Sequence, residues 1–213
     1  MIKSLDPCTT VHETVYRSLR AKIMIGEILP GVSFTIRGIA KDFGVSMTPV
    51  REATRRLVAE GALTMSSSGR INSPLLNNER IEELVCIRSL LEPELAVRAL
   101  PRVHGVLIER LSSVNSFIEQ MIVKQNTVGY LQRNIEFHKT LYLRAQAPAM
   151  LALLETVWLQ SGPTMRSLYD QRLRDQSVSS HREILQALKG GNEVTLANSI
   201  RADLTESLRM LLN

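Results

Sequence analysis

Four polar side chains interrupt apolar helical stripes in the last two thirds of this 213-residue chain. Asn134 and His138 are four residues apart, so they share one face of a predicted helix. His181 and Asp203 interrupt two further stripes. Because a buried polar group needs a partner, the pattern predicts that the four side chains meet inside the protein. Such a centre would bind a metal ion or a small ligand, and histidines hydrogen-bonded within an ordinary core are the alternative.

Arg88 lies on another apolar stripe, which runs from Ile81 to Leu91. A buried guanidinium group needs an anion. Three partners stay open from the sequence, namely Glu92, Glu94 and the carboxylate of a bound effector. The large side chains that would wall an effector cavity, with ordinary core packing as the alternative, are Trp158, Met165 and Tyr169.

A different chemistry is indicated by GVSMTPVRE, residues 44–52. Ser46 or Thr48 can cap the helix that starts here, and Pro49 fits its first turn. Arg51 is unfavourable for stability, because a cation near a helix N-terminus opposes the helix dipole. A DNA phosphate or a guanine edge would compensate. Thr48 and Arg51 are therefore predicted to contact DNA, and a solvated first turn is the alternative.

The elements around this stretch form a recognisable order. A first helix is expected within VYRSLRAKIMIGEILPG, a second from its cap Thr35 to Gly44, and a third from about Ser46 to Glu60. GALTMSSSGRINSP then predicts a two-stranded hairpin. This order is typical of a winged helix-turn-helix domain, which we place at residues 1–74. In such a domain the helix after the turn enters the major groove of DNA.

No strand pattern follows Pro74. The short connections between amphipathic segments favour an antiparallel bundle. The expected fold class is therefore mainly α, with an N-terminal winged helix-turn-helix followed by an antiparallel six-helix bundle over residues 77–213. The predicted helices of the bundle are at about 78–100, 104–124, 127–146, 148–172, 176–189 and 193–212.

The formal net charge of +5 is unevenly distributed. Residues 1–76 hold 10 Lys and Arg against 6 Asp and Glu, or +4, and residues 77–213 hold 16 against 15, or +1. A positive excess in the first third suits a polyanionic partner. The chain has no apolar run of about 20 residues that would span a membrane. The start MIKSLDPCTT lacks the apolar run of a signal peptide, so we expect a cytoplasmic protein.

The stretch LPGVSFTIRGIAKDFGVSMTPVREATRRLVAEGAL resembles the DNA-binding domain of the GntR family of bacterial transcription regulators. The resemblance covers most of residues 11–74. Met47 stands where the family usually has an arginine, so its contact would be apolar, for instance with a thymine methyl group. The DNA contacts that the resemblance implies are Arg37, Thr48, Arg51 and the wing glycine Gly69. To these contacts we add Arg70, as a phosphate or minor-groove contact.

Residues 77–213 are similar to the FCD ligand-binding domain, which defines the FadR-type branch of that family. The similarity lies in RSLLEPELA, NIEFHKTLYLRAQAPAMLALLE and HREILQALKGGNEVTLANSIRADL. With six predicted helices, this domain looks like those of the VanR-like subgroup, which are shorter than the FadR-type domains of this branch.

Many FCD domains bind a divalent metal through an Asp or Asn, a His four residues later and two further His. Asn134, His138 and His181 fall on the first three positions, and Asp203 replaces the fourth histidine. Aspartate is a competent ligand for Zn, Mn or Ni, so the resemblance implies one such ion per chain. The alternative is a metal-free site in which these residues hydrogen-bond an effector directly.

Together these features predict a DNA-binding transcription regulator that acts as a repressor, and not an enzyme. A small organic acid, bound by Arg88 and the polar centre with or without a metal, would control the affinity for a palindromic operator. The family dimerises through its helical domain, and a palindrome requires two DNA-binding domains, so a homodimer is expected. A metal sensor, for which the ion itself is the signal, is the second hypothesis. A metalloenzyme is the third, although the chain has no HExxH-type motif.

Overall fold

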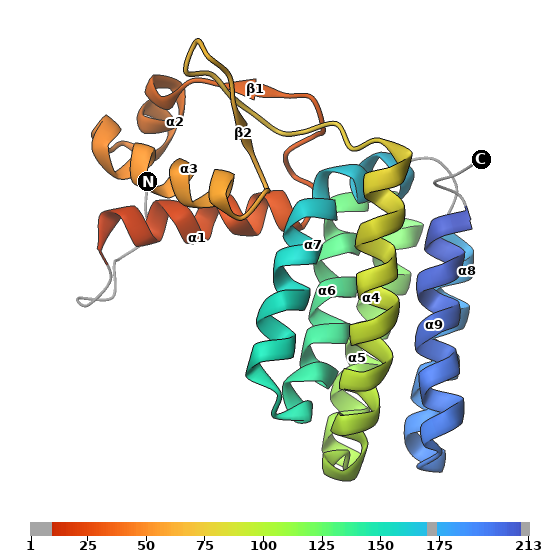
Figure 1. Cartoon of the computed structure of the whole chain (residues 1–213). Helices are drawn as coiled ribbons and strands as arrows, with labels where there is room; N and C mark the ends of the chain where they lie inside the picture. Colours follow the sequence, from red (N-terminus) through yellow and green to blue (C-terminus); the bar gives the residue numbers. More distant parts are fainter. Residues whose placement is uncertain (1–9, 170–173, 210–213) are drawn as a thin grey trace. The chain divides into compact units, whose positions relative to one another are not determined.

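The structure, a computed structural model, describes residues 10–169 and 174–209 (Figure 1). This part of the chain divides into two compact units, with boundaries after Leu75, Val157 and Met165. The first unit combines the sequence up to Leu75 with Trp158–Met165, and the second takes the remainder. None of the described helices is long and apolar enough to cross a membrane.

The helices of the first unit enclose a core because their apolar residues recur at helical spacing. Val15, Leu19 and Ile23 are buried along α1, and Val50 and Leu57 of α3 belong to the same cluster. The elements are α1 Val11–Met24, β1 Ser33–Phe34, α2 Ile36–Phe43, α3 Met47–Ala59, β2 Thr64–Met65 and β3 Ile71–Asn72.

The turn between α2 and α3 has the glycine that was expected, but not the hydroxyl cap. The side chain of Thr35 caps α2 by accepting a hydrogen bond from the backbone nitrogen of Gly38 (2.9 Å). Gly44 ends α2 with a φ of 65°, a left-handed conformation that favours glycine. Ser46 occupies the N-cap position of α3, but its side chain makes no capping hydrogen bond. The predicted hydroxyl cap of α3 is therefore wrong, and Ser46 and Thr48 both stay exposed.

The sheet of the first unit has three strands, where the sequence predicts a hairpin of two. β3 pairs antiparallel with both β2 and β1, in the order β1-β3-β2. Phe34 and Met65 both lie opposite Ile71. β1 has only two residues, so it carries no alternating pattern by which the sequence could reveal it.

The second unit is a bundle of long helices that lie alongside one another (Figure 1). α9 packs against α4 and α8, and α5 packs against α6 and α8. The helices that follow Leu75 are α4 Asn78–Ala99, α5 Gly105–Val123, α6 Thr127–Tyr142, α7 Pro148–Tyr169, α8 Arg174–Gly190 and α9 Glu193–Arg209. All six predicted helices are present, and the mainly α fold class is confirmed.

The helix ends differ from the prediction in one informative place. α6 ends at Tyr142 rather than near residue 146, and a single turn of 3-10 helix, Leu143–Ala145, follows it. Gln146 then takes a left-handed φ of 51°, which an α-helix cannot continue through. The predicted ends at 172 and 212 lie outside the described residues.

Candidate functional site

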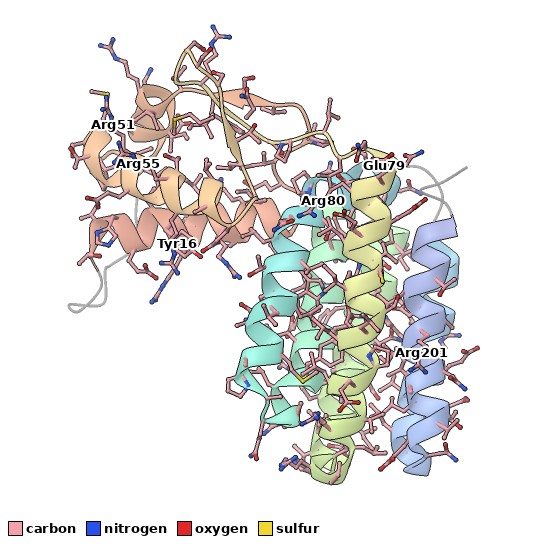
Figure 2. The ribbon with its side chains drawn as sticks, viewed as in Figure 1. Tyr16, Arg51, Arg55, Glu79, Arg80 and Arg201 are labelled. Carbon is pink, nitrogen blue, oxygen red and sulfur yellow. The ribbon has the colours of Figure 1, made fainter. Side chains whose placement is uncertain are left out.

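The first turns of α3 present an exposed, chemically varied surface in the first unit. Met47, the first residue of the helix, is 46% exposed, and Thr48 and Arg51 are exposed beside it. Arg51 and Arg55 are one turn apart, and both extend from the same part of α3 (Figure 2). An apolar side chain, a hydroxyl and two guanidinium groups are therefore available to base edges and phosphates.

Ion pairs separate the arginines of the first unit into two groups. Arg17 pairs with Glu13 (2.7 Å), and Arg56 pairs with Glu13 (3.1 Å) and Glu60 (3.2 Å). The carboxylates of Glu13 and Glu60 thus neutralise Arg17 and Arg56. The second group has no ion pair within residues 10–169 and 174–209, and it consists of Arg37, Arg51, Arg55 and Arg70. The charges of this second group stay available to a polyanion.

Arg55 is not among the predicted DNA contacts. Its position four residues after Arg51 places both side chains on one face of α3. That spacing is the signal by which the sequence could have indicated Arg55.

Gly69 and Arg70 lie in the turn between β2 and β3. Gly69 has a φ of 76°, which favours glycine, and the space around it is open. The turn is closed by a hydrogen bond from the backbone nitrogen of Ser66 to the carbonyl oxygen of Arg70 (2.9 Å). The side chain of Arg70 is exposed at this tip, and Arg37 is exposed on α2. Every predicted DNA contact is thus open to a partner.

His138, His181 and Asp203 come together in the second unit, from α6, α8 and α9. One ligand atom of each residue lies within 4.8 Å of the others, and all three side chains are buried. Nε2 of His138 is 3.3 Å from Nε2 of His181 and 3.3 Å from Oδ2 of Asp203. Nε2 of His181 is 4.0 Å from Oδ1 of Asp203. Three of the four residues predicted for the polar centre therefore converge.

Asn134 is the fourth residue predicted for the centre. It lies one turn before His138 on α6 and is half-buried. In the described part of the chain, no hydrogen bond joins its amide to His138, His181 or Asp203. Spacing by four fixes the direction of a side chain but not how far it reaches toward another helix.

The electrostatics of the centre favour a neutral imidazole beside a carboxylate. Burial lowers the pKa of His181 to about 4, although the charge of Asp203 opposes this. Burial acts to raise the pKa of Asp203, but its close contact with His138, with smaller effects of His181 and Arg88, holds it below its ordinary value. At neutral pH, His181 offers a lone pair and Asp203 a negative charge, which are the forms that ligate a metal.

Arg88 has a partner within the protein. Its Nε donates a hydrogen bond to Oε1 of Glu92 (2.6 Å), and Glu92 is fully buried. Burial acts to lower the pKa of Arg88, but the charge and hydrogen bond of Glu92 raise it overall. Glu94 instead pairs with Arg98 (2.6 Å). Of the two carboxylates of the chain that the sequence leaves open, Glu92 is the one that pairs with Arg88.

Both histidines are also contacted on the side away from Asp203. Nδ1 of His138 lies 3.2 Å from the hydroxyl oxygen of Tyr142, and Nδ1 of His181 lies 3.3 Å from Oδ1 of Asn115. The ring of Phe137 stacks on His181, with 4.4 Å between ring centroids. Tyr142 and Asn115 are not among the predicted site residues.

Two of the three large side chains predicted to wall a cavity are well buried. Trp158 and Tyr169 are 5% and 3% exposed, and Met165 is half-buried. Tyr169 packs against Tyr130, with ring centroids 4.7 Å apart. These contacts agree with the alternative of ordinary core packing.

Two of the three separations in the buried centre match those between the ligands of a metal ion, and the third, between Nε2 of His181 and Oδ1 of Asp203, is wider at 4.0 Å. A bond from Zn to an imidazole nitrogen is about 2.0–2.1 Å long, so neighbouring ligands in a tetrahedron are roughly 3.3 Å apart. Nε2 of His138 lies at this distance, 3.3 Å, both from Nε2 of His181 and from Oδ2 of Asp203. Two imidazole nitrogens and one carboxylate oxygen are a donor set that suits Zn, Mn or Ni.

Comparisons with known proteins match both parts of the chain. Residues 11–71 match the family described as bacterial regulatory proteins, gntR family, and residues 83–206 match the FCD domain. The HTH-type transcriptional regulator McbR of Escherichia coli (strain K12) is 26% identical over 179 residues, which cover 82% of this chain and 80% of that protein. The gluconate operon transcriptional repressor of Bacillus subtilis (strain 168) is 25% identical over 208 residues, or 93% of this chain and 83% of that protein.

A solved structure agrees with these matches. The structure of E. coli McbR/YncC superposes with a TM-score of 0.89 at 23% identity, and covers 96% of this chain and 100% of that chain. The relatives are transcription regulators rather than enzymes, which removes the metalloenzyme hypothesis. With a winged helix-turn-helix at one end and an FCD domain at the other, the chain belongs to the GntR family of bacterial transcription regulators, in its FadR-type branch.

Proposed function

We propose that this regulator is a repressor whose operator affinity is controlled by a small organic acid. The observation that carries the proposal is the buried convergence of His138, His181 and Asp203. Two imidazole nitrogens and a carboxylate so close together can bind a cation or a ligand. The name of the Bacillus subtilis relative, the gluconate operon transcriptional repressor, supports repression.

On the DNA side, the N-terminal part of α3 enters the major groove. Thr48 and Arg51 contact phosphates and base edges there, and Met47 makes an apolar contact with a base. Their exposure, and the lack of ion pairs to Arg51 within the described chain, support this arrangement. The contacts with the DNA backbone or the minor groove come from Arg37, Arg55, Gly69 and Arg70.

The repressor binds a palindromic operator as a homodimer. A palindrome presents the same half-site twice, related by a two-fold axis, so two copies of α3 are needed. It acts in the cytoplasm, where bacterial DNA is found.

In the second unit, His138, His181 and Asp203 hold one divalent ion, which is Zn, Mn or Ni. A bound ion supplies a coordination position for the carboxylate of the effector. Asn134, one turn along α6, contacts the effector beside the ion. Arg88 is close enough to lower the pKa of Asp203, so its charge also favours an anionic ligand.

The effector reaches the DNA-binding unit through α4. This helix follows the winged helix directly in the chain, and it carries Arg88 and Glu92. An effector that binds one position of α4 better than another shifts the population toward it. DNA affinity falls when the favoured position does not match the two operator half-sites.

The test begins with binding of the protein to its own upstream DNA and to random DNA of equal length, over a series of salt concentrations. A salt-sensitive preference for the upstream DNA is expected, and equal affinity for both would contradict the proposal. The metal content of the wild type and of His138→Ala is then compared. If the wild type binds no metal after incubation with Zn, Mn and Ni, the metal site is excluded, and direct binding of the effector by these residues remains.

A metal sensor is distinguished by the same assay. If a physiological concentration of metal alone releases the operator, the ion is the signal. If release needs an organic acid in addition, the metal is only part of the effector site.

A further inference from the structure

We propose that Tyr142 and Asn115 are positioning residues that hold His138 and His181 as the tautomers with hydrogen on Nδ1. Both Nε2 atoms then keep their lone pairs and face Asp203. The inference rests on the metal-binding part of the proposed function, because a histidine nitrogen binds a metal only through a free lone pair.

Tyr142 sets the tautomer of His138 because its single hydroxyl hydrogen is already used. The hydroxyl donates to Oε2 of the buried Glu92 at 2.9 Å. The other carboxylate oxygen of Glu92 is held by Arg88 at 2.6 Å, so this acceptor is fixed in place. The oxygen of Tyr142 can therefore only accept from Nδ1 of His138, 3.2 Å away. Nδ1 of His138 must therefore carry a hydrogen, so the neutral ring is the Nδ1–H tautomer.

Asn115 sets the tautomer of His181 in a similar way. Its Nδ2 donates to Oε1 of Glu119 (3.2 Å), and Arg182 donates to the same oxygen (2.8 Å). This orients the amide so that its oxygen faces Nδ1 of His181 at 3.3 Å. A carbonyl oxygen only accepts, so Nδ1 of His181 donates. The stacked ring of Phe137 limits rotation of the imidazole.

The outer contacts distinguish a metal site from a self-satisfied histidine cluster. When both rings are neutral with hydrogen on Nδ1, two lone pairs and a carboxylate face one another, with 3.3 Å between His138 and each of the other two groups. Without Tyr142, His138 could carry its hydrogen on Nε2 and donate to Asp203. The centre would then satisfy itself and resist a metal. Tyr142 and Asn115 thus keep the centre open to a cation.

The tautomers can be measured directly in the metal-free protein. The chain has 4 histidines, and His12 and His104 are exposed, so they serve as references in a nitrogen NMR spectrum of the imidazole rings. The spectrum is recorded with a chelator, about two pH units above the ordinary histidine pKa of ~6.5. In the wild type, His138 and His181 are expected as Nδ1–H tautomers. A hydrogen on Nε2 of either ring would overturn the proposal for that ring.

Variants test whether Tyr142 and Asn115 cause this preference. Tyr142→Phe should move the hydrogen of His138 to Nε2 and leave the tautomer of His181 unchanged. Asn115→Ala should remove the tautomer preference of His181 and leave that of His138 unchanged. The matched control is Tyr130→Phe, a buried tyrosine on the same helix, which should change neither ring. A Tyr142→Phe protein that folds and keeps Nδ1–H on His138 would sink the assignment. If Tyr142→Phe does not fold, Glu92→Gln serves, because its amide can donate to Tyr142 and turn the hydroxyl hydrogen toward His138.

Metal affinity gives the second readout. Tyr142→Phe and Asn115→Ala should each weaken Zn binding about 10–100-fold, the usual effect of losing an outer contact, and Tyr130→Phe should not. Equal Zn affinity in the wild type and in a variant with a changed tautomer would overturn the positioning role. A wild type that binds no metal contradicts the proposed function instead, and the spectrum of the metal-free protein still decides the tautomers.

Discussion

Nε2 of His138 lies 3.3 Å from Oδ2 of Asp203, so the carboxylate of α9 faces the imidazole of α6 directly. The close contact of His138, with smaller effects of His181 and Arg88, outweighs burial and keeps the pKa of Asp203 below its ordinary value. A negative charge therefore lies at the position where the resemblance to FCD domains implies a histidine. Metal binding in this protein should depend on that charge.

Asp203→Asn tests this dependence, because asparagine keeps the shape of the side chain and removes its charge. We expect a loss of Zn affinity greater than the 10–100-fold that an outer contact usually contributes. Asp203→His should retain metal. Titration calorimetry after chelator treatment measures both, with the exposed Asp42→Asn as control. Unchanged affinity in Asp203→Asn would exclude Asp203 from the coordination sphere.

Arg51 and Arg55 should affect DNA binding in different ways. If its guanidinium reads a base edge as proposed, Arg51→Ala is expected to cost about 1–3 kcal/mol and to relax sequence preference. Arg55→Ala should weaken operator and random DNA alike and reduce the slope of log affinity against log salt by about one. Arg17→Ala is the control, since Glu13 already pairs with this exposed arginine. If Arg55→Ala behaves like Arg17→Ala, Arg55 lies outside the DNA interface.

Met47 should determine part of the operator sequence. It is the first residue of α3 and is 46% exposed, so a longer polar side chain fits there without disturbing the core. Met47→Arg is expected to shift preference toward guanine at one position in each half-site, because arginine donates to O6 and N7 of guanine. Selection of bound sequences from a random DNA pool compares the two proteins. The same consensus for both would show that Met47 does not face a base.

The helices could be predicted from the sequence because their signals are local. Apolar residues at helical spacing such as Val15, Leu19 and Ile23 are buried where the pattern requires it. β1 could not be predicted, because Ser33–Phe34 becomes a strand only by pairing with Ile71 and Asn72 far along the chain. The missing cap of Ser46 depends on the orientation of one hydroxyl, which residue type does not fix.

The buried centre was predictable for a similar reason. His138, His181 and Asp203 are conspicuous because each is a polar residue on an apolar stripe. Tyr142 and Asn115 carry no such signal, because tyrosine is common in cores and the roles of both depend on contacts between helices. Sequence spacing indicates the face of a helix, but the depth and the partner of a side chain come from packing.

Tyr16 should make the stability of the first unit sensitive to alkaline pH. Its hydroxyl donates to Oε1 of Glu60 (2.7 Å), and the guanidinium of Arg56 lies 3.7 Å from the centroid of its ring. Burial, together with the hydrogen bond and charge of Glu60, raises the pKa of Tyr16 to about 12 from an ordinary value of 10.0. Between these values the unfolded chain loses the phenol proton and the folded protein keeps it. The free energy of unfolding should therefore fall as pH rises, by up to about 1.4 kcal/mol per pH unit.

Tyr16→Phe isolates this contribution, because other groups that titrate at alkaline pH are the same in both proteins. Below the ordinary tyrosine pKa of ~10, the variant should be less stable by about 0.5–1.5 kcal/mol, the usual net value of one hydrogen bond. Above it, the free energy of unfolding falls faster in the wild type than in the variant, so the two values should converge and then cross. Urea unfolding at a series of pH values measures the difference. Two parallel curves would mean that Tyr16 titrates equally in the folded and unfolded states.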